Sequence, residues 1–272
     1  MFLQRALITL TLGPIALYLI YLGGFFYFVP LAIILLLASL EYSQIVHKIG
    51  WQVPPLLLLP VVIMQWVLAQ WLDQALFGPI LMLSLMIITA VSLWQYEMKS
   101  SQTVPANWFA SVAGLILFGW LCSHFFRLRA LPDMAWQWTM LAMLGTWIAD
   151  SGAYLVGRFA TGKFIFGKHA LSPRLSPNKT VEGFVGGIVL GTSFTIFIGS
   201  LLGIALLPSL LLGLLVSVIG TVGDLSISLL KREAGVKDSG TLFPGHGGAL
   251  DRIDSLMWTV TIAYYLARIY VM

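Results

Sequence analysis

Long apolar runs recur along the whole chain, separated by short segments that contain polar residues, glycine or proline. Each run is close to the ~20 residues that a helix needs to cross a bilayer. The runs show no period-two alternation, and backbone polar groups in lipid must be satisfied internally, so we expect helices. The predicted fold class is therefore all-α, a polytopic integral membrane protein. The pattern predicts nine spans, at residues 5–22, 25–42, 54–72, 76–95, 107–125, 135–157, 182–203, 204–225 and 251–271.

Composition supports a membrane protein. The 272 residues are 59% hydrophobic and 10% charged, whereas a soluble domain carries about 25% charged residues. The first apolar run is long for a signal peptide and lacks a clear cleavage site, so we interpret it as the first span. Cys122 is the only cysteine, which excludes an intrachain disulfide, and the four histidines lack metal-ligand spacing. A zinc site is therefore not expected.

The net charge is +4. In a membrane protein such an excess reflects cytoplasmic loops rather than nucleic-acid binding. With nine spans, most lysines and arginines fall on one side, in the connections that follow the sixth and eighth spans. We therefore expect the N-terminus and both polar connections in the cytoplasm, with the protein in the cell (inner) membrane. Because most basic residues follow residue 150, we predict scaffold helices in 1–149 and a catalytic region in 150–272, within one integrated membrane domain.

The polar stretch from Asp224 to Asp254 concentrates groups that bind metal and phosphate. Asp224, Ser228 and Lys231 are spaced i, i+4, i+7, so they share a face if the preceding apolar helix continues through them. Asp251 and Asp254 are spaced i, i+3, so a helix starting near residue 250 would place both carboxylates on one side.

Between these acids lie Lys237, Asp238 and the glycine-rich turn 244–248, where glycine permits close backbone approach to a ligand. Carboxylates ringed by lysine and arginine suit metal-assisted phosphoryl or nucleotidyl transfer. The structural alternative is that each acid caps a helix or pairs with a nearby base.

Two further features precede this stretch. Asp150 lies in an apolar run, where an acid is costly and is a functional candidate, although it could be a helix-end acid followed by Arg158. The basic 158–182 connection could be a phosphate-binding lid or an ordinary cytoplasmic loop, and its charge alone leaves both open. The glycines at 183, 187 and 191 would form a smooth helix stripe, used for packing within the chain rather than between subunits.

The pattern S-x-x-K-R-x4-K-D-x-G-x2-F-P-x-H-G-G-x2-D-R-x-D resembles the motif of the phosphatidate cytidylyltransferases. Asp150 begins a D-S-x-A-Y element, and Ser172–Gly183 is also similar to that family. The resemblance covers roughly residues 145–258, and the N-terminal spans match only in hydrophobic character. Ala249 departs from the larger apolar residue usual there, which should alter packing rather than chemistry.

The resemblance implies transfer of CMP from CTP to phosphatidate, giving CDP-diacylglycerol and pyrophosphate. It also implies Mg²⁺, a second cation that would be K⁺, and a homodimer. The implied metal ligands are Asp224, Asp251 and Asp254. The implied catalytic residues are Asp224, Ser228, Lys231, Arg232, Lys237, Asp238, His246 and Arg252. The implied substrate-binding residues are Asp150, Ser176, Asn178, Lys179, Thr180, Glu182, Gly247 and Gly248.

Two alternatives stay open. Many spans with intramembrane acids also suit a transporter or channel, although charges that cluster toward one membrane face argue against a pathway. A different metal-dependent lipid nucleotidyl- or phosphotransferase is the second. The CDP-alcohol phosphotransferase pattern D-G-x2-A-R-x8-G-x3-D-x3-D is absent from the sequence.

Overall fold

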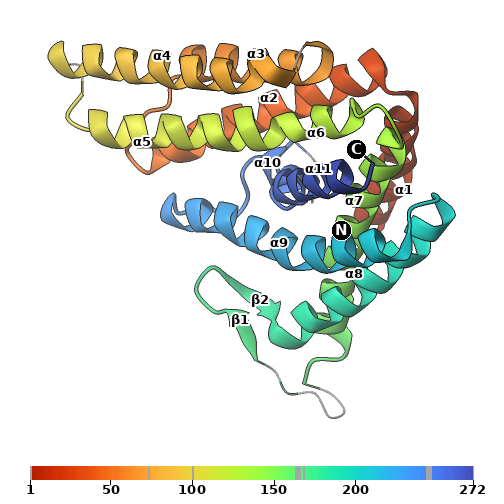
Figure 1. Ribbon diagram of the computed structural model, residues 1–272. Coiled ribbons are helices and arrows are strands. Elements are labelled where there is room, and N and C mark those ends of the chain that lie inside the picture. The colour runs from red at the N-terminus through yellow and green to blue at the C-terminus, as the bar shows by residue number, and fades with distance from the viewer. Residues whose placement is uncertain are drawn as a thin grey trace. The chain divides into compact units, whose positions relative to one another are not determined.

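The computed structural model describes residues 2–72, 74–99, 101–162, 167, 169–242 and 247–271 (Figure 1). The chain forms two compact units, each assembled from separate segments of sequence. Unit 1 contains residues 1–130 and 233–253, and unit 2 contains residues 131–232 and 254–272. Neither unit is bounded at residue 149, and the division into scaffold and catalytic halves remains a prediction.

Unit 1 is helical. Its elements are α1 (Phe2–Leu22), α2 (Gly24–Lys48), α3 (Pro55–Trp71), the 3-10 turn η1 (Gln74–Leu76), α4 (Phe77–Glu97), α5 (Val104–Gly114), the π-helical segment η2 (Leu115–Leu121), α6 (Cys122–Arg129) and the short α10 (Leu250–Ile253). Segments α5, η2 and α6 run on without interruption. The indole of Trp66 donates to the carbonyl of Phe118 in η2 at 2.7 Å, and Tyr42 donates to Ala110 at 2.7 Å. These buried aromatic side chains thus satisfy their polar atoms on neighbouring helices.

Unit 2 consists of α7 (Ala135–Phe159), β1 (Ala170–Ser172), β2 (Ser176–Thr180), α8 (Val181–Leu201), α9 (Leu206–Glu233) and α11 (Leu256–Val271). Helices α7 and α8 pack along the predicted glycine stripe. A Cβ on Gly187 would lie 2.8 Å from the carbonyl oxygen of Ala149, and one on Gly191 would lie 2.7 Å from the Ala149 side chain. Such distances require glycine, so the prediction of packing within the chain is confirmed.

The first eight predicted spans each fall on a helix or on an uninterrupted run of helical segments. Among the described residues, five helical segments are long and apolar enough to cross a membrane: 24–48, 77–97, 104–129, 181–201 and 206–233. The chain is thus an all-α membrane protein, while the number nine stays a prediction. One detail differs from the expected helices: the two-stranded antiparallel hairpin β1–β2 forms in the polar connection between α7 and α8.

The helix expected from residue 250 is interrupted. Helix α10 ends at Ile253, residues 254–255 form a turn, and α11 begins at Leu256. The prediction that Asp251 and Asp254 stack along one continuous helix is therefore wrong. The two acids also belong to different units.

Candidate functional site

Helix α9 carries the first group of predicted site residues. Because α9 runs without a break to Glu233, Asp224, Ser228 and Lys231 lie on one face, as predicted. The hydroxyl of Ser228 donates to Oδ1 of Asp224 at 3.2 Å. Lys231 is only 6% exposed, although it carries a charge. A lysine this buried needs compensating negative groups.

The β hairpin brings a second lysine to the same face. Nζ of Lys179, on β2, lies 2.6 Å from Oδ2 of Asp224, and the two side chains are 27% and 29% exposed. The guanidinium of Arg232 donates through Nε to the carbonyl of Leu175 in the hairpin turn at 2.9 Å. The hairpin is therefore anchored to α9 at two points, one of them the predicted substrate-binding Lys179.

Asp254 completes the arrangement in unit 2. It lies in the turn before α11, is 8% exposed, and its Oδ1 accepts the amide hydrogen of Ser255 at 2.7 Å. The carboxylates of Asp224 and Asp150 and the ammonium group of Lys231 act electrostatically on the Asp254 carboxyl group. We call Asp150, Lys179, Asp224, Lys231 and Asp254 the α9 charge cluster.

The predicted metal can be tested against this cluster. Asp254 is a buried carboxyl with the carboxylate of Asp224 as an electrostatic neighbour. Carboxylate oxygens are the donors that Mg²⁺ prefers, and a divalent cation would offset the repulsion between two such acids. The acids of the cluster therefore fit a metal ion. Within the described ranges, however, no group of three or more Asp, Glu, His or Cys side chains is close enough to hold one by itself. The three-carboxylate metal site stays a prediction.

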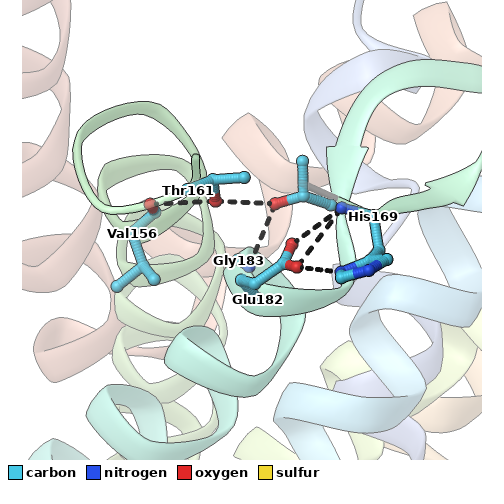
Figure 2. A network of polar contacts seen from close by, with 6 residues as sticks. Val156, Thr161, His169, Glu182 and Gly183 are labelled. Carbon is cyan, nitrogen blue, oxygen red and sulfur yellow. Dashed lines mark hydrogen bonds and ion pairs between the residues drawn. The ribbon is translucent and has the colours of Figure 1, made fainter. Parts of the chain in front are cut away.

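Two of the predicted substrate-binding residues have structural contacts in unit 2 (Figure 2). Thr180 caps α8 by accepting the amide hydrogen of Gly183 at 3.0 Å. Oε1 of Glu182 lies 2.6 Å from Nδ1 of His169, whose backbone amide also donates to the same carboxylate. These contacts fix how the polar segment enters and leaves the hairpin. Substrate contact by Thr180 or Glu182 remains a prediction.

Asp251 lies in unit 1. Its Oδ2 accepts two backbone amides, from Ser239 at 2.8 Å and from Gly248 at 2.9 Å. Gly247 has φ +79°, and a Cβ at that position would overlap the Asp251 carboxylate. Position 247 therefore requires glycine for two reasons, the positive φ angle and the lack of room for a Cβ. The described glycines, Gly247 and Gly248, thus contact the carboxylate of this predicted metal ligand or leave room for it.

The remaining predicted residues fall into three groups. Asp150, Asn178, Arg232, Lys237, Asp238 and Arg252 are exposed. Ser176 is half-buried on β2, beside Asn178 and Lys179. His246 lies outside the described residues.

Glu41 of unit 1 is not among the predicted site residues, yet its side chain accepts three hydrogen bonds. The carboxylate of Glu41, on α2, accepts the hydroxyl hydrogen of Ser239 at 2.7 Å and the amide hydrogens of Ala249 at 3.0 Å and Leu250 at 2.9 Å. Its only sequence signal is an acid at the end of an apolar run, the usual position of an unremarkable helix-end charge. Its partners lie about 200 residues away, beyond the reach of a local pattern.

Comparison with known proteins gives consistent results. The model of the cytidylyltransferase family matches residues 3–270. A phosphatidate cytidylyltransferase of Bacillus subtilis is 37% identical over 73% of this chain and 69% of that protein. One of Synechocystis sp. is 32% identical over 91% of this chain and 90% of that protein. One of Staphylococcus saprophyticus is 44% identical, over 46% of this chain and 47% of that protein.

Proposed function

Because the chain belongs to the cytidylyltransferase family, we propose that it is a phosphatidate cytidylyltransferase. It transfers CMP from CTP to phosphatidate and releases pyrophosphate. The observation that carries the proposal is the α9 charge cluster, where carboxylates and lysines from four segments of unit 2 gather beside a membrane-length helix. A reaction between a charged nucleotide and a charged lipid headgroup requires such groups at the end of a membrane helix.

The chemistry needs no covalent enzyme intermediate. A phosphate oxygen of phosphatidate forms a bond to the α-phosphorus of CTP, and the bond from that phosphorus to the oxygen bridging toward the β-phosphate breaks. Pyrophosphate leaves with the electron pair. Both substrates are anions, so the enzyme must align them and neutralise their charge. Lys179 and Lys231 are the cations of the cluster, and the exposed Arg232, Lys237 and Arg252 are further catalytic cations that the family resemblance implies.

The metal requirement is part of the proposal. Asp224, Asp251 and Asp254 are the proposed metal ligands, for Mg²⁺ and for K⁺ as the expected second cation. Bound Mg²⁺ would neutralise charge on the phosphate oxygens. Lys179 and Ser228, which contact Asp224, would fix the orientation of its carboxylate. Asp150 would contribute negative charge at the edge of the cluster.

We also propose where the reaction takes place. Loop charges favour a cytoplasmic location for the connections that follow the sixth and eighth predicted spans. There, CTP from the cytoplasm can meet a lipid headgroup in the inner membrane. The homodimer implied by the family resemblance stays a prediction.

A direct assay tests the function. Purified protein in detergent is incubated with labelled CTP, phosphatidate and Mg²⁺, and CDP-diacylglycerol is measured. We expect product from the wild type and a loss of about 100-fold or more in Asp224→Asn, because a charge that acts on the reacting phosphates is removed. Asp133→Asn, an exposed acid between α6 and α7, is the matched control. A wild type that forms no product, or an Asp224→Asn variant with wild-type turnover, would refute the proposal.

A further inference from the structure

Glu41 is hydrogen-bonded to residues distant in the sequence, unlike a helix-end acid on the surface that faces only solvent. Its two carboxylate oxygens accept three hydrogen bonds, all from the segment 239–250, which follows residues 131–232 of unit 2 in the sequence. Hydrogen bonds to an ionised acceptor are roughly twice as strong as neutral ones. Glu41 therefore joins α2 to the loop that carries Asp251.

The loop is shaped to receive this carboxylate. A Cβ at Gly240 or at Gly248 would overlap the oxygens of Glu41. Both positions are glycine, so the backbone can close around the acid from two sides. The second glycine of the Gly247–Gly248 pair is thus explained by contact with Glu41, whereas the first is explained by its backbone conformation and by Asp251.

Ser239 connects Glu41 to Asp251 through hydrogen bonds. Ser239 is 8% exposed and donates its hydroxyl hydrogen to Oε2 of Glu41. That hydroxyl also accepts the amide hydrogen of Asp251 at 3.3 Å, while the amide of Ser239 donates to Oδ2 of Asp251 at 2.8 Å. Glu41, Ser239 and Asp251 thus form one continuous hydrogen-bonded network within unit 1.

We infer that Glu41 is a positioning residue of the enzyme: through Ser239 and the amides of residues 249 and 250, it holds Asp251 in the orientation that metal and substrate require. The inference rests on the proposed function, because Asp251 is a proposed metal ligand. Residues that orient metal ligands typically contribute about 10- to 100-fold to metal affinity or activity. Glu41 lies on α2, so a helix of the N-terminal region that was predicted to be scaffold would also contribute to the reaction.

The test uses Glu41→Gln in the full-length protein. The NH₂ group of the glutamine amide can only donate hydrogen bonds. It would replace one carboxylate oxygen and would therefore face the N–H or O–H donors that this oxygen accepts from. We expect kcat to fall about 10- to 100-fold and the Mg²⁺ concentration for half-maximal activity to rise by a similar factor. Glu97→Gln removes an exposed acid at the end of α4 in the same unit, and it should match the wild type in both.

A second measurement does not depend on activity. Hydrogen exchange of the Ala249 and Leu250 amides should accelerate in Glu41→Gln and stay unchanged in Glu97→Gln, because only the first loses their acceptor. If the wild type forms no CDP-diacylglycerol but the exchange result holds, the proposed function fails and the network stands. Wild-type kinetics and exchange in Glu41→Gln would overturn the inference.

Two milder variants decide the matter if Glu41→Gln does not fold. Glu41→Asp keeps the charge but shortens the side chain, and Ser239→Ala removes the hydroxyl that joins Glu41 to the Asp251 amide. We expect both to raise the Mg²⁺ requirement several-fold, and the double variant to cost no more than the worse single one, since they act through the same contact. Folded Glu41→Asp and Ser239→Ala variants with the wild-type Mg²⁺ requirement would overturn the inference.

Discussion

Asp254 is a buried acid, 8% exposed, with the carboxylate of Asp224 and the ammonium group of Lys231 as electrostatic neighbours. Carboxylate oxygens are the donors that Mg²⁺ prefers. The proposed metal site therefore predicts that removal of the Asp254 carboxylate weakens Mg²⁺ binding.

Thermal unfolding in detergent, with and without Mg²⁺, tests this prediction in the wild type and in Asp254→Asn. Asp133→Asn is the control, and it should respond to Mg²⁺ as the wild type does.

Mg²⁺ should stabilise the wild type but not Asp254→Asn. A ligand that binds only the folded state stabilises it, so Mg²⁺ should raise the Tm of the wild type. Asp254→Asn should lose that response together with its activity. Equal stabilisation of both proteins by Mg²⁺ would remove Asp254 from the proposed metal site.

At the scale of single residues, the sequence predicted the face of α9 but not the network around Glu41. Asp224, Ser228 and Lys231 follow helical spacing, which a local pattern records. Lys179 was selected through the family resemblance, but its ion pair with Asp224 depends on a hairpin that places it against α9. Glu41 and Ser239 are 198 positions apart in sequence, and their contact follows only from the tertiary fold.

At the scale of elements, the helices were the most predictable part of the molecule. An apolar run of membrane length can satisfy its backbone in lipid only as a helix, and the first eight predicted spans are helical. The break after Ile253 was missed because the spacing of Asp251 and Asp254 suits a continuous helix as well as an interrupted one. The hairpin was missed because its strands are short and polar, with no alternating apolar pattern to reveal them.

The α7–α8 contact gives a prediction at this scale. Gly187→Leu should destabilise the protein by about 1–3 kcal/mol or more, because the new side chain meets the backbone of α7. Val189→Leu places the same residue on an exposed part of α8 and should be nearly neutral. Thermal unfolding of the two variants in the same detergent provides the measurement. Equal stability would mean that α7 and α8 are not packed along the glycine stripe.

At the scale of the whole molecule, the charge distribution predicts an orientation that single cysteines can test. The native Cys122 is buried and should react slowly, so the wild-type chain is a suitable background. Arg174→Cys in the hairpin turn and Asp238→Cys after α9 should be labelled from the cytoplasmic side. Asp133→Cys should be labelled only from the opposite side. Labelling of all three from one side would contradict the predicted topology.

The discontinuity of unit 1 has a consequence for how the protein is made. Its helices α1 to α6 leave the ribosome first, but Ser239, Ala249 and Leu250 follow only after the whole of residues 131–232 has been synthesised. Contacts between such distant segments form late, since the intervening chain must be ordered first. A nascent or truncated chain that ends before residue 239 lacks the groups that bind Glu41. Completion of unit 1 therefore requires nearly the entire chain to be synthesised, and shorter products lack the contacts between Glu41 and the segment that carries Asp251.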